Sequence, residues 1–364
     1  MDATFPYAAR LLKFYHASGR QLPWRGEGDP YRIWVSEVML QQTGVATVKG
    51  YYGRFIDKFP TVAELAGADL GMVLKEWQGL GYYRRAENLH RGAKVVHDSL
   101  GGCFPETLER WMSLPGVGRS TAAAIMAIGW NQRQAILDGN CKRVLARVMA
   151  LDDPVNSAQG ERLLWQRAYE LTPADRPGDY AQAIMDLGAT VCTPRAPRCR
   201  ECPWCLGCRA WETQQVDRYP NRKKPKVRPR YGQVAVLVQN SDGQWLMRRR
   251  PRGGLLAGLW EPLSTKRWLL PQLPPDMQKV GEELKHQWQV CGRNVQLLGE
   301  VRHTFTHFHL TVWVCLCQYV SGWPLEEEVR WWNPEQSDLP LSTLHAKVFA
   351  VHDHQGGANR IPSC

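Results

Sequence analysis

Two carboxylates stand in sequence surroundings that give them different chemistry. Glu37 lies in an almost wholly apolar segment, Tyr31 to Gln42, which Asp29-Pro30 can cap and start as a helix. If this face turns inward, burial raises the pKa of Glu37 and makes it a candidate proton donor near neutral pH. The alternative is a glutamate whose carboxylate reaches solvent. No Lys or Arg lies within four residues on that helical face, which argues against a simple ion pair.

Asp138 comes just before a predicted helix, Lys142 to Met149. An aspartate at such a place is most often an N-cap, and a helix terminus favours its ionised form. A protonated glutamate and an ionised aspartate are the pair of groups needed to break a glycosidic bond. One acid protonates the leaving group, and the other stabilises the oxocarbenium-like sugar.

Five cysteines within seventeen residues predict one metal site: Cys192, Cys199, Cys202, Cys205 and Cys208. Two ligand sets remain open, the unbroken C-x2-C-x2-C-x2-C run and the C-x6-C-x2-C-x5-C set that omits Cys205. Zinc sites more often use two separated C-x2-C pairs, so the compact spacing favours a four-iron cluster over zinc. One cysteine is left over in either set.

A short glycine-containing turn separates two predicted helices, Glu106 to Ser113 and Arg119 to Ile128. Gly116 and Gly118 allow backbone amides to point outward at a helix start, which is a suitable seat for a phosphate. Their small size also permits DNA to approach closely. The alternative is a plain turn between two helices.

Composition supports a soluble, folded protein with a polyanionic partner. The 364 residues allow two or three domains, and 44% hydrophobic with 22% charged residues excludes a disordered or fibrous chain. There is no apolar run long enough for a membrane span and no secretory pattern at the start, so we expect a cytoplasmic protein, nucleoid-associated if bacterial. We also expect it to be a monomer. The net charge of +11 favours nucleic acid, although charge that serves only solubility is the alternative.

The chain divides into a helical part, a linker and an α+β part. Apolar positions recur at helical spacing over residues 1–215. Residues 216–231 carry seven Lys or Arg, one acid and three prolines, and we read them as an extended basic linker that either tethers the domains or also follows a phosphate backbone. Strand-like patterns follow over 232–353, with a hairpin at Asn240 to Gly243 and strands at Val301 to His309 and Leu310 to Cys317. We expect 354–364 to be a disordered tail.

The ordered motifs resemble those of adenine DNA glycosylases of the MutY type, within the helix-hairpin-helix glycosylases that include endonuclease III. The resemblance is dense over residues 1–215 and looser from 232 onward. It is carried by Ser36 to Thr43, Gly79 to Ala86, Leu114 to Ala122, Leu137 to Asn140 and the C-x6-C-x2-C-x5-C run.

The resemblance implies an all-α helix-hairpin-helix glycosylase domain with an iron-sulfur cluster loop and a C-terminal α+β Nudix-like domain. It implies removal of adenine mispaired with 8-oxoguanine or guanine in double-stranded DNA. Glu37 matches the family's catalytic acid and water-activating group, and Asp138 its cation-stabilising aspartate. Gln42 and Tyr82 match residues that wedge into the duplex; the alternatives are an exposed helix-end glutamine and a packed core tyrosine.

The resemblance also implies one structural [4Fe-4S] cluster, which would order a basic loop against DNA. Its ligands would be Cys192, Cys199, Cys202 and Cys208, so that Cys205 departs from the family pattern.

Ser120 separates related enzymes. Family members that also cut the strand carry a nucleophilic Lys just after the hairpin, where this chain has Ser120. Without that amine no Schiff base forms there, so we predict a monofunctional glycosylase with Ser120 among the DNA-facing residues.

The C-terminal part resembles the family's Nudix-like domain through Gly253 to Pro262 and Arg302 to His309. The helix segment Glu282 to His286 has too few glutamates for the metal cluster of a true Nudix hydrolase. We therefore predict a recognition domain for oxidised guanine, with Phe305, Thr306 and His307 near the lesion. The alternative is a strand with ordinary surface histidines.

Two other functions remain possible on these residues. A related glycosylase could act on another base, against which Ser120 and the C-terminal domain argue. A non-catalytic iron-sulfur DNA-binding protein could sense redox state, against which the presence of both acids argues.

Overall fold

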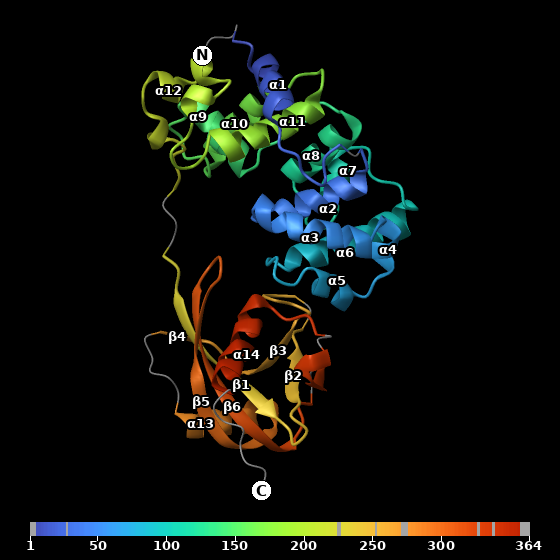
Figure 1. Ribbon diagram of the computed structural model, residues 1–364, viewed down its shortest axis with the longest axis vertical. Helices are drawn as coiled ribbons and strands as arrows, with labels where there is room; N and C mark the ends of the chain where they lie inside the picture. Colours follow the sequence, from blue (N-terminus) through green and yellow to red (C-terminus); the bar gives the residue numbers. More distant parts are fainter. Residues whose placement is uncertain are drawn as a thin grey trace. The chain divides into compact units, whose positions relative to one another are not determined.

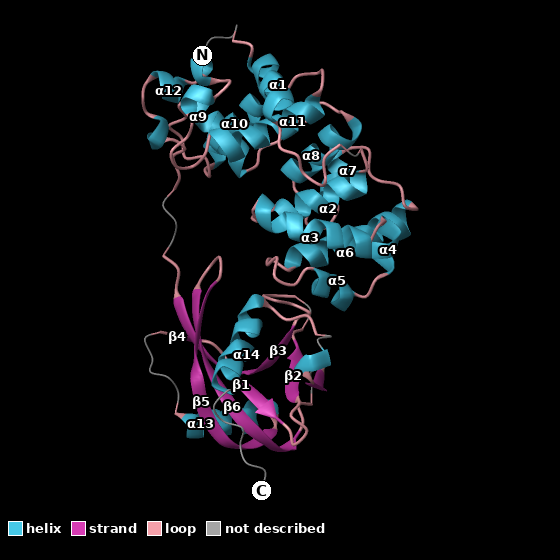
Figure 2. Cartoon of the chain, in the orientation of Figure 1, coloured by secondary structure: helices cyan, strands magenta, loops and turns pink. Residues whose placement is uncertain are grey.

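The computed structural model describes residues 5–26, 28–223, 227–251, 253–270, 276–325, 328–336 and 339–356. The chain separates into two compact units, one made of Met1–Gly67 with Asn88–Pro225 and the other of Ala68–Glu87 with Lys226–Cys364. The first unit is helical and the second contains a β-sheet, as expected (Figures 1 and 2). Among the described residues, we find no helix with the length and apolar character that a membrane span requires.

Residues 68–87 group with the C-terminal part, although we expected them in the helical domain. Within this second unit, Tyr83 Oη donates a hydrogen bond to the Leu341 carbonyl at 3.1 Å, and Leu341 N–H donates to Gln78 Oε1 at 3.4 Å. These pairings join residues far apart in the sequence, which local patterns do not reveal.

The first unit is built from short helices. Before the glycine-containing turn these are α1 Tyr7–Ser18, α2 Pro30–Leu40, α3 Val45–Lys58, α4 Val62–Gly67, α6 Arg84–Lys94 (whose first four residues belong to the second unit), η1 Val95–Ser99 and α7 Leu108–Met112. After it come α8 Arg119–Trp130, α9 Gly139–Met149, α10 Ala158–Leu171, α11 Pro177–Asp186, η2 Leu187–Val191, η3 Cys199–Glu201, η4 Cys205–Gly207, α12 Arg209–Glu212 and η5 Val216–Arg218.

Local sequence signals explain the helices that matter for the site. Asp29 caps α2 by accepting from Tyr31 N–H at 2.9 Å, with Pro30 in the first turn, as predicted. Small residues let α8 pack closely: a side chain at Gly178 of α11 would meet the Ala127 carbonyl oxygen at 2.5 Å. Helices α8 and α11 therefore approach each other at backbone distance.

The first part of the expected linker is anchored to the helical unit. Val155 N–H donates to the Asn221 carbonyl at 2.9 Å, and Lys223 N–H donates to Asn156 Oδ1 at 2.9 Å. The extended tether we expected over 216–231 is thus shorter at both ends, because residues up to 223 are bonded to the loop at 152–156 and β1 already begins at Arg230. Lys224, Pro225 and Lys226 lie outside the described residues.

The second unit holds a seven-stranded sheet with the path order β5-β6-β1-β3-β2-β7, in which β4 also pairs with β1. Strands β1 and β6 run parallel, and the other pairings are antiparallel. The elements are α5 Leu70–Glu76, β1 Arg230–Gln239, β2 Trp245–Arg249, β3 Trp260–Ser264, β4 Trp268–Leu269, α13 Met277–Trp288, β5 Val290–Thr304, β6 His309–Gly322, β7 Val329–Trp332, η6 Pro334–Gln336 and α14 Thr343–Gly356.

Alternating residues of β1 supply two separate cores. Ala235 and Leu237 pack with Val348 of α14 on one face, and Val234 and Val236 pack on the other face in the core that includes α13. The sheet is therefore covered by one helix on each side. Helix α14 continues through Gly356, so residues 354–356 belong to it instead of to a tail; residues 357–364 lie outside the described residues.

Candidate active site

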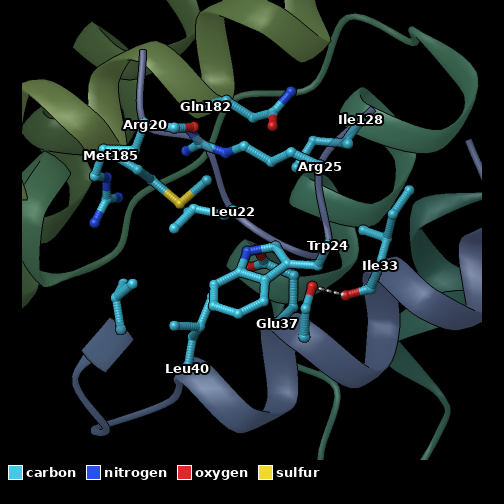
Figure 3. A pocket seen from close by; sticks show the side chains of 12 residues that line it. Arg20, Leu22, Trp24, Arg25, Ile33, Glu37, Leu40, Ile128, Gln182 and Met185 are labelled. Carbon is cyan, nitrogen blue, oxygen red and sulfur yellow. Dashed lines mark hydrogen bonds between the residues drawn. The ribbon is translucent and has the colours of Figure 1, made fainter. Parts of the chain in front are cut away.

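A hollow of about 390 Å³ opens to solvent between α2, α8, α11 and the segment that joins α1 to α2 (Figure 3). All of these elements belong to the first unit. Polar and charged groups stand on both walls, Glu37 on one and Gln182 on the other. The lining residues are Arg20, Leu22, Trp24, Arg25, Ile33, Ser36, Glu37, Leu40, Val45, Ile128, Gln182 and Met185.

Glu37 projects from α2 into this hollow beside Trp24 and Leu40 (Figure 3). Burial and, to a smaller extent, the negative charge of Asp138 raise the pKa of Glu37, and Arg25 opposes them; together they bring this pKa from 4.5 to about 7. The side chain of Glu37 is half-buried and turns toward the hollow. A carboxylic acid that is half-protonated near neutral pH can donate a proton to a bound base.

Asp138 is the N-cap of α9. Its Oδ1 accepts from Cys141 N–H at 2.7 Å, and its Oδ2 accepts from Asn140 Nδ2 at 3.1 Å. Its charge acts on Glu37, so the structure brings the two predicted acids together. Asp138 is outside the set of residues that line the hollow in the described part of the chain.

Ser120 connects the hairpin to the Asp138 segment. The Leu137 N–H donates to Ser120 Oγ at 3.0 Å, one peptide unit before Asp138. Ser120 thus lies beside the segment that carries Asp138. Its side chain is a hydroxyl, whose oxygen accepts this backbone hydrogen bond.

Sequence reasoning missed a cluster of three charged residues: Arg20 and Arg25, which line the hollow, and Asp186, which binds both of them. Asp186, at the end of α11, accepts from Arg20 Nε at 2.6 Å and from Arg25 through two bonds of 2.8 Å. Burial alone would raise the pKa of Asp186, but the bonds from Arg25 and Arg20 outweigh it and lower the pKa. The available signal was an acid inside the apolar segment Ala183 to Val191, the same kind of signal that identified Glu37.

The two hairpin glycines have different roles. Gly116 has φ +75°, and a side chain there would meet Asn88 Cβ at 2.7 Å, so the turn itself requires glycine. Gly118 is the N-cap of α8 with φ −90° and has no atom near the position of a side chain. Only Gly116 is explained by the protein's own packing. Gly118 keeps an exposed helix N-terminus free of side-chain atoms.

Gln42 and Tyr82 are exposed and both have left-handed backbone conformations. Their φ angles are +58° and +49°, values that are uncommon for residues other than glycine and that occur often at functional sites. Gln42 follows the end of α2. Tyr82, in the second unit, is 46% exposed, so the alternative of a packed core tyrosine is wrong. Arg85 stacks on its ring at 5.4 Å.

All five clustered cysteines line a second hollow of about 290 Å³ in the first unit, together with Arg147, Val191, Trp211 and Val216. Arg147 donates to Cys192 Sγ at 3.3 Å and to the Thr193 carbonyl at 2.7 Å. Within the described residues no three His, Cys, Asp or Glu side chains are grouped closely enough to hold a single metal ion. Thiols spread around one hollow with a positive side chain fit a multi-iron cluster better than a tetrahedral zinc ion.

The three predicted lesion contacts lie on one hairpin tip in the second unit. We expected strands over Val301 to His309 and Leu310 to Cys317, but the chain turns earlier, because Phe305 N–H donates to the Phe308 carbonyl at 2.9 Å. Phe305 packs on Phe308, with ring centroids 4.7 Å apart, while Thr306 and His307 are exposed. His307 thus lies in the turn between β5 and β6 and not on a strand, and its exposure is also that of an ordinary surface histidine.

Comparisons with known proteins match both units. The HhH-GPD superfamily base excision DNA repair protein model matches residues 35–168, and the NUDIX domain model matches residues 234–351. Adenine DNA glycosylases of Mus musculus and Homo sapiens are each 36% identical, covering 97% and 96% of this chain and 79% and 74% of their own lengths. The adenine DNA glycosylase of Buchnera aphidicola subsp. Baizongia pistaciae is 31% identical, over 96% of this chain and 99% of its own. The solved structure of a thermostable thymine-DNA glycosylase has a TM-score of 0.53 at 30% identity and covers 57% of this chain and 95% of that one.

Proposed function

This chain belongs to the adenine DNA glycosylases, and we propose that it hydrolyses the N-glycosidic bond of adenine mispaired with 8-oxoguanine or guanine without cutting the strand. The observation that carries the proposal is Glu37, which lines a solvent-open hollow, has a pKa raised to about 7 and lies close enough to Asp138 for the charge of Asp138 to contribute to that shift. A base inside a duplex cannot reach such a hollow, so the adenine is extruded from the stack.

The walls of the hollow suit a flat purine. Trp24, Leu22 and Leu40 offer apolar surface, and the Gln182 amide offers a donor and an acceptor for the edge of the base (Figure 3). This combination orients the base so that a ring nitrogen faces Glu37.

The proposed reaction is a hydrolysis in which protons and electrons balance. Glu37 gives its proton to the purine, and the electron pair of the breaking C–N bond leaves with the base. Asp138 stabilises the positive charge on the sugar, held in place by the N–H groups of Cys141 and Asn140. Glu37, now ionised, takes a proton from the attacking water and returns to its starting state.

Strand cutting through a Schiff base requires an amine at the position of Ser120, and its hydroxyl cannot supply one. We therefore assign monofunctional chemistry to this chain. The hydroxyl instead accepts from Leu137 N–H and steadies the segment that carries Asp138.

Several exposed groups are proposed to contact DNA. The N-terminus of α8, with Gly116 and Gly118 before it, offers backbone amides to a phosphate. Gln42 and Tyr82 are proposed to enter the duplex at the mispair, a role that suits their exposure and their left-handed backbones.

One [4Fe-4S] cluster is proposed in the cysteine hollow, held by Cys192, Cys199, Cys202 and Cys208. Such a cluster supplies a covalent cross-link that orders its loop. Arg147 offsets part of the negative charge of the thiolates through its bond to Cys192 Sγ.

The hairpin tip of the second unit is proposed to recognise the oxidised guanine through Thr306 and His307, with Phe305 supporting the turn. Its test is the preference for 8-oxoguanine over guanine opposite adenine. Thr306→Ala and His307→Ala should reduce this preference. Substitution of the exposed His286 of α13 by Ala is the matched control and should leave it unchanged.

The direct test of the substrate is base release from four duplexes with adenine opposite 8-oxoguanine, guanine, cytosine or thymine. Release from the first two and not from the others supports the proposal. Release of an oxidised pyrimidine in place of adenine, or no release from any duplex by the folded protein, would contradict it.

A further inference from the structure

We propose that Cys205 is a reserve ligand: it can hold the fourth iron position of the cluster in place of Cys199. This inference rests on the proposed cluster and adds a residue that lies outside the proposed ligand set. Three of the five cysteines are fixed by the core, while Cys199 and Cys205 compete for one remaining place.

The three fixed cysteines pack against the helical core. Of the five, Cys192, Cys202 and Cys208 contact the core cluster that includes Leu145, whereas Cys199 and Cys205 do not. Cys192 has additional support, since Arg147 bonds its sulfur at 3.3 Å and Arg143 Nε bonds its carbonyl at 2.8 Å.

Backbone geometry places Cys199 and Cys205 symmetrically about Cys202. Cys202 N–H donates to the Cys199 carbonyl at 3.2 Å, and Cys205 N–H donates to the Cys202 carbonyl at 3.1 Å. Cys202 itself has an extended backbone, with φ −74° and ψ 126°, so these bonds close two separate short turns that meet at Cys202. Cys199 is thus one turn before Cys202, and Cys205 is one turn after it.

Cys205 lines the same hollow as the other four cysteines, including its neighbours Cys199 and Cys202. A cysteine that served only packing would be expected inside the core, as Cys141 is. The position of Cys205 is that of a ligand, although four other thiols already suffice.

The exchange needs no oxidant or reductant. The bond between iron and the Cys199 sulfur breaks, and this thiolate takes up a proton from water. The Cys205 thiol releases a proton to water and its sulfur forms the new bond to iron. Loss of Cys199, by substitution or by alkylation, therefore leaves four ligands.

The test compares alanine variants, because alanine cannot replace a thiolate with an oxygen ligand. The variants are Cys199→Ala, Cys205→Ala, the double variant and Cys202→Ala. Each is purified without oxygen, and its iron and sulfide content, visible absorption and thermal unfolding are measured. Cys199→Ala and Cys205→Ala should each keep the iron content of the unmodified protein. The iron content of the double variant should fall at least about tenfold, because only three ligands remain. That of Cys202→Ala should fall as far, because the inference lets Cys205 replace Cys199 and not the ligands that pack on the core.

Two results would overturn the inference while leaving the proposed cluster intact. Cys199→Ala could lose iron as completely as Cys202→Ala, or Cys205→Ala alone could lose it. An unmodified protein without iron and sulfide would instead refute the cluster itself, and adenine release measured on the same sample would show separately whether the proposed catalytic function stands.

Discussion

Arg25 donates two hydrogen bonds of 2.8 Å to the two carboxylate oxygens of Asp186, and its charge also acts on Glu37. The Asp186 side chain is 1% exposed and also binds Arg20. Because Asp186 binds both terminal nitrogens of Arg25, its negative charge offsets part of the positive charge that Arg25 exerts on Glu37. The pair therefore helps to keep Glu37 protonatable.

Asp186→Asn should reduce both stability and the pH range of activity. Breaking a buried pair leaves two arginines uncompensated and should cost about 3–5 kcal/mol of unfolding free energy, measured by urea denaturation. The charge of Arg25, no longer neutralised, should lower the pKa of Glu37, so base release should begin to fall at lower pH than in the unmodified protein.

Asp179→Asn on the same helix is the control for this experiment. The ion pair between Asp179 and Arg176 is partly exposed, so it should contribute less than about 1 kcal/mol to the unfolding free energy. An Asp186→Asn protein whose rate drops equally at every pH would mean that Asp186 serves folding alone.

Gly116→Ala and Gly118→Ala should separate stability from DNA binding. Gly116→Ala should lower the unfolding free energy by about 1–3 kcal/mol, because the backbone has a positive φ and the new methyl group would meet Asn88. At Gly118, space is open and φ is ordinary, so the loss should stay below about 1 kcal/mol while duplex affinity falls, because the new methyl group obstructs a phosphate. Equal affinity for duplex DNA in the unmodified and Gly118→Ala proteins would remove the hairpin from the DNA interface.

Glu37→Gln should make the protein more stable at high pH. The folded-state pKa of about 7 exceeds the ordinary 4.5, so folded protein holds this proton more tightly and loses stability as pH rises between those values. Glutamine cannot ionise and avoids that loss. Its stability advantage should grow by up to about 3 kcal/mol between pH 4 and pH 8.

Substitution of the exposed Glu109 by Gln is the control. The difference in unfolding free energy between this variant and the unmodified protein should stay constant over the same pH range. If the stability advantage of Glu37→Gln were also the same from pH 4 to pH 8, the folded protein would not raise the pKa of Glu37.

Ser120→Ala should slow base release without changing the type of chemistry. It removes the acceptor of Leu137 N–H, which costs about 1–3 kcal/mol when the donor stays buried, and it loosens the segment that carries Asp138. Borohydride should trap no covalent complex between the unmodified protein and its DNA. A trapped complex would show that another amine forms a Schiff base and that the monofunctional assignment is wrong.

The acids and the cysteines could be predicted because their signals are local. Asp29 and Asp138 cap helices whose first residues are adjacent in sequence, and the apolar neighbours of Glu37 lie within one helical turn. The spacing of the cysteines similarly appears in a single stretch. These features need no knowledge of how distant segments pack.

Features that join distant residues could not be predicted in the same way. Asp186 binds Arg20 and Arg25, which lie more than 160 residues away in the sequence. The turn between β5 and β6 lies at Phe305–Phe308, earlier than we expected, where a backbone hydrogen bond joins these two residues. The anchoring of the linker at residues 221–223 likewise depends on a loop some 67 residues away. Such contacts follow from tertiary packing, which sequence periodicity does not encode.

The most direct test of the proposed chemistry is single-turnover release of adenine opposite 8-oxoguanine, measured from pH 5 to 9 for the unmodified protein and Glu37→Gln. The unmodified protein should lose activity as pH rises through about 7, where Glu37 gives up its proton. Glu37→Gln should bind the duplex with unchanged affinity and release adenine at least about 100-fold more slowly. Adenine release by Glu37→Gln at the unmodified rate would contradict the assignment of Glu37 as the proton donor.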